Sequence, residues 1–161
     1  PTTSSAASDV YKRQLIKLKK ISLNSKFGSS SLGKTLLKPT KLYVNEILKL
    51  SNKVKIKNMA HITGGGLISN LERIVPNNYS FEVSSKDLFF FHKKLFSHLM
   101  EKSGLTDIEM LKTFNCGYGM VIIIGQGDLK KTIINLNKLK QKFRILGKVT
   151  RKIEESKIKF I

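Results

Sequence analysis

The sequence predicts an α+β fold: a layered α/β/α domain built around a mixed sheet. Apolar residues recur at helical spacing in some segments and alternate with polar residues in others, which are the periods of helices and strands. Glycine and proline separate these segments, most clearly at Pro39, the triple glycine 64–66 and Pro76. The 161 residues, 40% of them hydrophobic, are enough for one domain with a buried core and argue against disorder.

The N-terminal third is expected to contain little regular structure before its first complete helix. Residues 15–23 have the pattern of the end of an amphipathic helix, and the Ser- and Gly-rich residues 24–31 predict a loop. Residues 32–40 predict a short apolar turn, because the residue before Pro39 avoids the helical region. Apolar residues at helical spacing then predict a helix over 43–50.

The middle of the chain predicts a strand, a helix and a second strand. Residues 54–62 form an apolar strand pattern that runs into the triple glycine. Apolar positions three and four apart predict a helix from Leu67 to the residue before Pro76. Tyr79, Phe81 and Val83 alternate with polar residues, which is typical of a half-buried strand.

The C-terminal half predicts three helices and three strands. Asp87 is expected to cap a helix whose stripe comprises Leu88, Phe91, Leu95 and Leu99. Thr106, with Glu109 three residues later, predicts a helix that begins with a capping box. The remaining elements are expected to be a buried strand at 118–124, a turn at 125–127, a helix over 129–139, and closing strands at 143–149 and 157–161.

Residues 1–14 are expected to be a disordered leader that does not belong to the native protein, followed by one domain over 15–161. Its residues are small and polar, and they follow neither the helical nor the strand period. It has no apolar stretch of the kind found in secretory signal peptides. No apolar run in the chain approaches the roughly 20 residues of a membrane span, so no membrane partner is expected.

The chain is strongly basic, with 30 Lys and Arg against 11 Asp and Glu and a formal net charge of +19. Such a charge favours nucleic acid, an anionic membrane or a multiply charged phosphate ligand as a partner. However, only four of the cations are arginine, the residue suited to bidentate phosphate and base contacts, and the lysines are scattered along the chain. We interpret most of the charge as a solvated surface and expect no nucleic acid partner. The single cysteine excludes an internal disulfide and fits a reducing cytosol.

Residues 61–73, HITGGGLISNLER, are the most informative stretch for chemistry. A strand enters three glycines and a helix leaves them, so backbone N–H groups can converge on an anion without obstruction by Cβ atoms. Thr63 can add a hydroxyl, while Gly66, Asn70 and Arg73 share one helical face. The arrangement suits a phosphate-bearing ligand, although a tight strand-to-helix turn needs the same glycines. The spacing matches neither a Walker A loop nor a dinucleotide fingerprint.

Residues 113–120, TFNCGYGM, form a second stretch in which Asn115 precedes two spaced glycines. They could place a side-chain amide and bare backbone at the edge of a cleft. The alternative is a glycine-bulged entry to a buried strand, with Cys116 as a small core residue. His92 and His98 are expected on a helix surface. Three histidines and one cysteine argue against a metal site built by the protein, so no metal ligand is assigned.

These motifs together resemble the C-terminal domain of the phosphoribosylformylglycinamidine cyclo-ligase family, also called aminoimidazole ribonucleotide (AIR) synthetases. Residues 37–44, LKPTKLYV, resemble the family's L-x-P-T-(R/K)-x-Y-V, and residues 60–66, AHITGGG, match its A-H-(I/L)-T-G-G-G. Residues 70–76, NLERIVP, are similar to N-x-x-R-(V/I)-(L/V)-P. Residues 109–117, EMLKTFNCG, are similar to E-M-x-(R/K)-T-F-N-x-G. The resemblance extends over essentially all of residues 15–161.

The resemblance implies an ATP- and Mg²⁺-dependent enzyme of purine biosynthesis in the cytoplasm. Family members close the imidazole ring of formylglycinamidine ribonucleotide and release ADP and phosphate. If the roles of the family's motif residues apply to the matching positions here, a substrate or nucleotide phosphate would be bound by Thr63, Gly64, Gly65 and Gly66, with Asn70 and Arg73 in support. His61 and Asn115 would lie near the reacting atoms.

The resemblance also implies that part of the enzyme is missing from this chain. The family's N-terminal domain, which carries most of the ATP and Mg²⁺ ligands and forms the homodimer, is absent, as is the H-S-N-G motif. No paired carboxylates in the sequence could hold Mg²⁺. We therefore expect this chain to be inactive when it is expressed alone.

Two other interpretations stay open. Another member of the same superfamily, such as a selenophosphate synthetase, a hydrogenase maturation protein or a thiamine-phosphate kinase, would share the fold. A basic nucleic-acid-binding module would need clustered cations and exposed aromatics on one surface. Here the phenylalanines at 89–91 and 96 fall in a stripe that is typical of a core.

Overall fold

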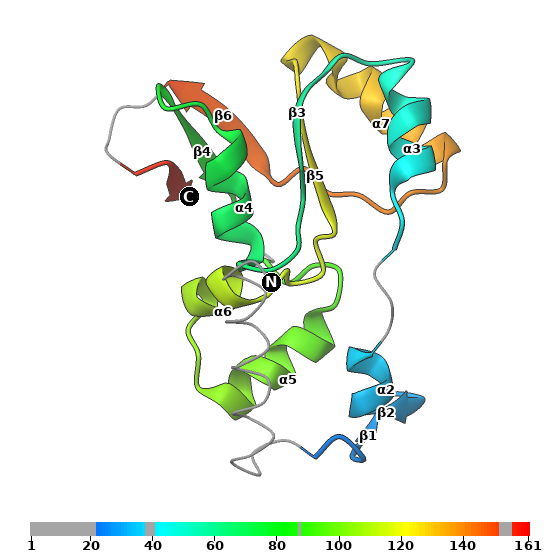
Figure 1. Cartoon of the computed structure of the whole chain (residues 1–161), viewed down its shortest axis with the longest axis vertical. Helices are drawn as coiled ribbons and strands as arrows, with labels where there is room; N and C mark the ends of the chain where they lie inside the picture. The colour runs from blue at the N-terminus through cyan, green and yellow to red at the C-terminus, as the bar shows by residue number, and fades with distance from the viewer. Residues whose placement is uncertain (1–21, 38–40, 87, 152–155) are drawn as a thin grey trace. The chain divides into compact units, whose positions relative to one another are not determined.

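The computed structural model describes residues 22–37, 41–86, 88–151 and 156–161 (Figure 1). The expected leader 1–14, most of the expected first helix at 15–23 and the expected cap Asp87 lie outside these residues. The described chain divides into two compact units. The first comprises the described residues among 22–37, 63–69 and 88–119, and the second comprises the rest. Each unit is described by itself.

The first unit begins with a small hairpin where the sequence predicts a loop. Strands β1 (Lys26–Phe27) and β2 (Ser30–Ser31) pair antiparallel. Gly28 in the turn has a φ of 62°, which glycine adopts without strain. Helix α2 (Leu32–Leu36) follows where we expected a turn, and its N-cap Ser31 accepts a hydrogen bond from the N–H of Lys34. The loop and turn predictions for this segment were therefore wrong, because short ladders and single helical turns leave no period to detect.

Two helices form most of the remaining first unit, and one of them begins later than expected. Helix α5 runs over Lys93–Ser103, whereas the sequence places its start near residue 87. The segment before it is a series of turns in which Leu88 and Phe89 are buried. Phe89 stacks on Phe96 with ring centroids 6.2 Å apart. Leu88 and Phe89, which we assigned to the helix, are therefore apolar because they pack in the core, and not because they are helical.

Helix α6 (Asp107–Thr113) confirms the prediction of a capping box. The hydroxyl of Thr106 accepts from the N–H of Glu109, and the Glu109 carboxylate accepts from the N–H of Thr106 at 2.8 Å. Met110 and Leu111 on this helix are fully buried. The ring of Phe114, which follows α6, lies 6.5 Å from that of Phe96.

The second unit contains the strand that leads to the triple glycine. Strand β3 (Ile56–His61) pairs antiparallel with β5 (Met120–Ile124), with His61 opposite Met120. Helix α3 (Val44–Ser51) and helix α7 (Leu129–Lys138) contact each other, and a short 3-10 helix, η1 (Gln126–Asp128), precedes α7 (Figure 1). These positions confirm the predicted strand at 54–62 and both helices. Strand β5 begins two residues later than expected, and Val121 is its buried member.

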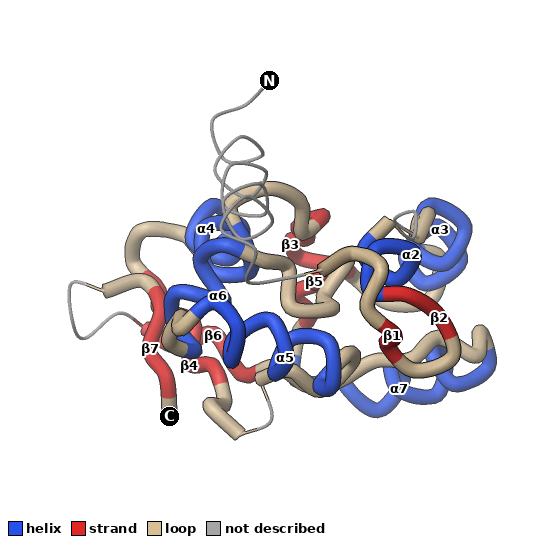
Figure 2. Tube along the Cα trace, turned by 90° about the horizontal axis from the view of Figure 1, so that it is seen from below, coloured by secondary structure: helices blue, strands red, loops and turns tan. Residues whose placement is uncertain are grey.

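A three-stranded mixed sheet completes the second unit. Its order is β6 (Gly147–Arg151), β4 (Tyr79–Val83), β7 (Ile158–Phe160), with β6 antiparallel and β7 parallel to β4 (Figure 2). The strand predicted at 143–149 is shifted toward the C-terminus. A Cβ atom on Gly147 would lie 1.8 Å from the carbonyl oxygen of Glu82, so a glycine is required where the two strands meet.

Helix α4 (Gly66–Ile74) runs from the first unit into the second and confirms the helix predicted after the triple glycine. Helices and mixed strand pairings together make an α+β fold. The described strands lie in three small separate sheets, of which one is mixed as expected. Within the described residues, no helix is long and apolar enough to cross a bilayer.

Candidate functional site

The glycine loop, residues 63–66, joins β3 to α4 as the sequence predicts. Gly65 and Gly66 have φ values of 84° and 67°, in the left-handed region that L side chains rarely adopt. Thr63 is exposed, Gly64 and Gly65 are half-buried, and Gly66 is buried. The loop thus presents its first three residues to solvent and turns its last residue into the protein.

Gly66 is explained by packing inside the first unit. A Cβ atom at this position would lie 2.2 Å from the carbonyl oxygen of Leu111 and 2.6 Å from the carbonyl carbon of Lys112. The loop therefore lies directly against the last turn of α6. Because α6 leads into Asn115, this contact places the glycine loop beside the helix that carries the second motif into position.

Asn70 and Arg73 lie together on α4, as their spacing predicts. The Asn70 side chain is buried, with 1% of its surface exposed, and its Oδ1 accepts a hydrogen bond from Nη2 of the exposed Arg73. Seven residues of helical rise separate Arg73 from Gly66 by about 10 Å along the axis. Asn70 therefore holds the guanidinium of Arg73, and Arg73 is the member of the pair that solvent can reach.

His61 is the last residue of β3 and lies two positions before the glycine loop. Its backbone is held in the ladder opposite Met120, while its side chain is exposed. The ring of Tyr43 lies 6.2 Å from the imidazole, centroid to centroid, at an interplanar angle of 66°. The imidazole therefore has an aromatic neighbour that comes from the residue before α3.

Asn115 lies in a tight turn in the first unit. Its Oδ1 accepts from the N–H of Gly117 at 3.2 Å, and its carbonyl oxygen accepts from the N–H of Tyr118 at 2.9 Å. Gly117 has a φ of 86°, and a Cβ atom there would lie 2.9 Å from Cβ of Phe91. The turn fixes the carbonyl end of the Asn115 side chain, so its NH₂ group is the end suited to a ligand.

Cys116 is a core residue, as one of the two interpretations expects. It is fully buried, and its thiol donates to the carbonyl oxygen of Met110 with Sγ 3.5 Å away. Burial, with a smaller contribution from the Asp107 carboxylate, raises the pKa of the thiol to about 12. Such a thiol is not a nucleophile near neutral pH.

The structure thus divides the predicted residues between the two units. Thr63, Gly64, Gly65, Gly66 and Asn115 belong to the first, and His61, Asn70 and Arg73 belong to the second. No three His, Cys, Asp or Glu residues in the described part of the chain are grouped so that they could hold a metal ion.

Sequence reasoning did not assign a role to Lys41 and Tyr43. Tyr43 contacts His61, and the Lys41 ammonium lies 5.6 Å from the centre of the Tyr43 ring. Both residues fall in the segment 37–44 that carries one of the four family motifs. That position was the signal that could have identified them.

Comparison with known proteins matches residues 6–158 to the family model described as AIR synthase related protein, C-terminal domain. A phosphoribosylformylglycinamidine cyclo-ligase from Methylobacillus flagellatus is 42% identical over 117 residues, which is 73% of this chain and 33% of that protein. Proteins of the same name from Alkaliphilus oremlandii and Nitrosococcus oceani are 38% and 34% identical, over 76% and 85% of this chain. The chain spans about a third of the length of these curated relatives.

Proposed function

Because the chain belongs to the AIR synthase related family and carries its C-terminal domain, we propose that it is the C-terminal part of a phosphoribosylformylglycinamidine cyclo-ligase. The observation that carries this proposal is the glycine loop, which presents Thr63, Gly64 and Gly65 to solvent while Gly66 locks it onto α6. In this proposal the enzyme converts formylglycinamidine ribonucleotide to aminoimidazole ribonucleotide in purine biosynthesis.

We propose that the exposed part of the loop binds a phosphate of the ribonucleotide or of ATP. Backbone N–H groups at the start of a helix attract anions, and the absence of Cβ atoms at Gly64 and Gly65 lets a phosphate oxygen approach them. Gly66 contributes by packing and Asn70 by orienting Arg73, whose guanidinium supplies a positive charge on α4. Thr63 adds a hydroxyl donor.

The proposed reaction transfers the γ-phosphoryl group of ATP to the formyl oxygen of the substrate. The amidine nitrogen then attacks the activated formyl carbon, the carbon–oxygen bond breaks, and phosphate leaves as the ring closes. Phosphorylation turns a poor leaving group into a good one, so the protein mainly positions the reactants and neutralises charge. His61 and the NH₂ group of Asn115 are the candidates for contacts with the reacting amide.

The described residues do not fit a Mg²⁺ site, because no carboxylates are grouped to provide its oxygen ligands. We propose that Mg²⁺ and most of the ATP contacts come from the part of the enzyme that this chain does not span, which also forms the homodimer. The chain alone is then inactive. We further propose that the elements stack as α/β/α layers in the intact enzyme, that the enzyme works in the cytosol, and that it binds no nucleic acid.

A chimaera tests the proposal. The matching third of the Methylobacillus flagellatus protein is replaced by the corresponding residues of this chain, and ADP release is measured with ATP, Mg²⁺ and formylglycinamidine ribonucleotide. We expect turnover that depends on the ribonucleotide, and none from this chain alone. A folded chimaera that binds neither substrate would contradict the proposed function, and steady ADP release by the chain alone would contradict its dependence on the rest of the enzyme.

A further inference from the structure

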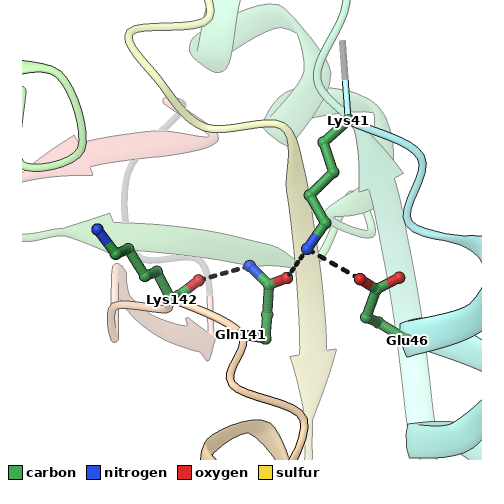
Figure 3. Close-up of polar contacts among 4 residues, drawn as sticks. All are labelled: Lys41, Glu46, Gln141 and Lys142. Atoms are coloured by element: carbon green, nitrogen blue, oxygen red, sulfur yellow. Dashed lines mark hydrogen bonds and ion pairs between the residues drawn. The ribbon is translucent and has the colours of Figure 1, made fainter.

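A lysine in the second unit is held from two sides (Figure 3). The ammonium of Lys41 lies 2.8 Å from Oε1 of Glu46 on α3 and also donates a hydrogen bond to Oε1 of Gln141. Nε2 of Gln141 in turn donates to the carbonyl oxygen of Lys142 at 2.7 Å. These contacts join the start of α3 to the segment that follows α7, and they restrain the ammonium although the Lys41 side chain is exposed.

The same ammonium lies over an aromatic ring. Nζ of Lys41 is 5.6 Å from the centroid of the Tyr43 ring, within the range of a cation–π interaction. Glu46 and Gln141 leave the ammonium little freedom to move away from the ring. The Tyr43 ring is therefore restrained by a charge that is itself restrained by two partners.

The Tyr43 ring lies beside the imidazole of His61. The centroids are 6.2 Å apart and the planes are inclined at 66°, which is an edge contact of the kind that aromatic pairs prefer. The ladder with Met120 fixes the backbone of His61, but an exposed side chain at the end of a strand can still change rotamer. A neighbouring ring selects among those rotamers.

We propose that Tyr43 is a positioning residue for His61, and that Lys41, held by Glu46 and Gln141, keeps Tyr43 in place. Tyr43 acts through the imidazole and not by touching the substrate. The role of this arrangement in catalysis rests on the proposed function. The contacts among Lys41, Tyr43 and His61 exist whether or not that function is correct.

Nuclear magnetic resonance of the full 161-residue chain tests the arrangement without a substrate. We expect nuclear Overhauser effects between the ring protons of Tyr43 and His61. Tyr43→Leu should move the His61 ring signals toward those of an unstructured histidine, and Tyr43→Phe should leave them unchanged because the hydroxyl is not needed. Tyr79→Leu, which removes an exposed tyrosine from β4, is the matched control and should not move them.

Lys41 supplies a second test that leaves the ring in place. Lys41→Met should broaden or shift the His61 signals, and Lys41→Arg should restore them because a guanidinium keeps both the ion pair and the cation–π contact. If Tyr43→Leu fails to fold, this pair of surface variants still decides the matter. Absence of the Tyr43–His61 Overhauser effect in a folded wild-type chain would overturn the proposal, as would His61 signals that do not respond to Lys41→Met.

Kinetics of the chimaera separate this inference from the proposed function. Tyr43→Leu should lower kcat by about threefold to tenfold with little change in KM, and Tyr43→Phe should retain full activity. If His61→Ala leaves kcat unchanged while the Overhauser effect is present, the role of His61 in the reaction fails and the positioning contact stands. If kcat falls in His61→Ala but not in Tyr43→Leu, the positioning role fails and the proposed function stands.

Discussion

A Cβ atom on Gly66 would lie 2.2 Å from the carbonyl oxygen of Leu111, a distance that no side chain can accept. The glycine loop and α6 are thus joined by a backbone-to-backbone approach. This contact gives the third glycine of the motif a structural task that is separate from any ligand, and it links the two motifs of the first unit.

Replacing Gly66 by alanine should destabilise the protein far more than the same change at Gly104. Both glycines have positive φ, 67° and 70°, but a Cβ atom on Gly104 would meet nothing within 4 Å. We expect Gly104→Ala to cost about 1 kcal/mol of unfolding free energy, and Gly66→Ala about 3 kcal/mol or more, because the main chain has to shift. Urea denaturation followed by circular dichroism measures both. Equal losses for the two variants would contradict the close approach.

Arg73→Ala in the chimaera should raise the KM of the ribonucleotide or of ATP by about tenfold, the effect of losing one charge-assisted hydrogen bond. Gly65→Val should raise the same KM, because it places a branched side chain where the phosphate would approach. Arg151→Ala removes an exposed arginine from β6 and is the control. Unchanged kinetics in both test variants would remove the loop and Arg73 from the binding site.

Cys116 should resist thiol reagents as long as the protein is folded. With its pKa raised from 9.0 to about 12, the thiolate population at pH 8 falls by about a thousandfold, and burial limits access further. The rate of reaction with Ellman's reagent is measured with and without urea. A Ser51→Cys variant adds an exposed thiol on α3 that should react at once. Rapid labelling of Cys116 in the native protein would show that the turn at 115–118 opens.

The capping box should make stability depend on pH in the acid range. The backbone N–H and then the hydroxyl of Thr106 donate to the Glu109 carboxylate, so its pKa is lowered from the ordinary 4.5 in the folded state. A lowered folded pKa means that the contribution is present above the unfolded pKa and is lost as the pH falls through the folded value. Glu109→Gln should therefore be less stable than wild type at pH 7, and the difference should shrink as the pH falls below 4.5.

The contact between Glu46 and Lys41 should also depend on pH in the acid range. Its carboxylate accepts a hydrogen bond from Lys41, which lowers its pKa. Acidification below the ordinary 4.5 should release Lys41 from Glu46, and the His61 signals should then respond as they do in Lys41→Met. Because acidification changes the charge of other carboxylates as well, the comparison is made against Glu46→Gln at pH 7. Identical His61 signals in Glu46→Gln and wild type would show that Gln141 alone holds Lys41.

Short sequence patterns predicted the elements that are determined by interactions between neighbouring residues. The capping box at Thr106 and Glu109 fixed the start of α6 because both partners lie within one helical turn. The triple glycine marked the junction of β3 and α4 because two of its members adopt positive φ. By contrast, the predicted start of α5 was wrong. Leu88 and Phe89 are buried in the turns before the helix, and their apolar side chains extend the helical pattern of the sequence beyond the helix itself.

The sequence by itself determined the family, the α+β class and the segments that contain the candidate site residues, because motifs and periods are properties of neighbouring residues. The tertiary structure decided what several of the candidate site residues contact. It buried Asn70 beneath Arg73, pressed Gly66 against Leu111, and set Tyr43 beside His61. The contacts of Gly66 with Leu111 and of Tyr43 with His61 join residues whose positions in the chain share no helical or strand period, so only packing in the folded chain could establish them.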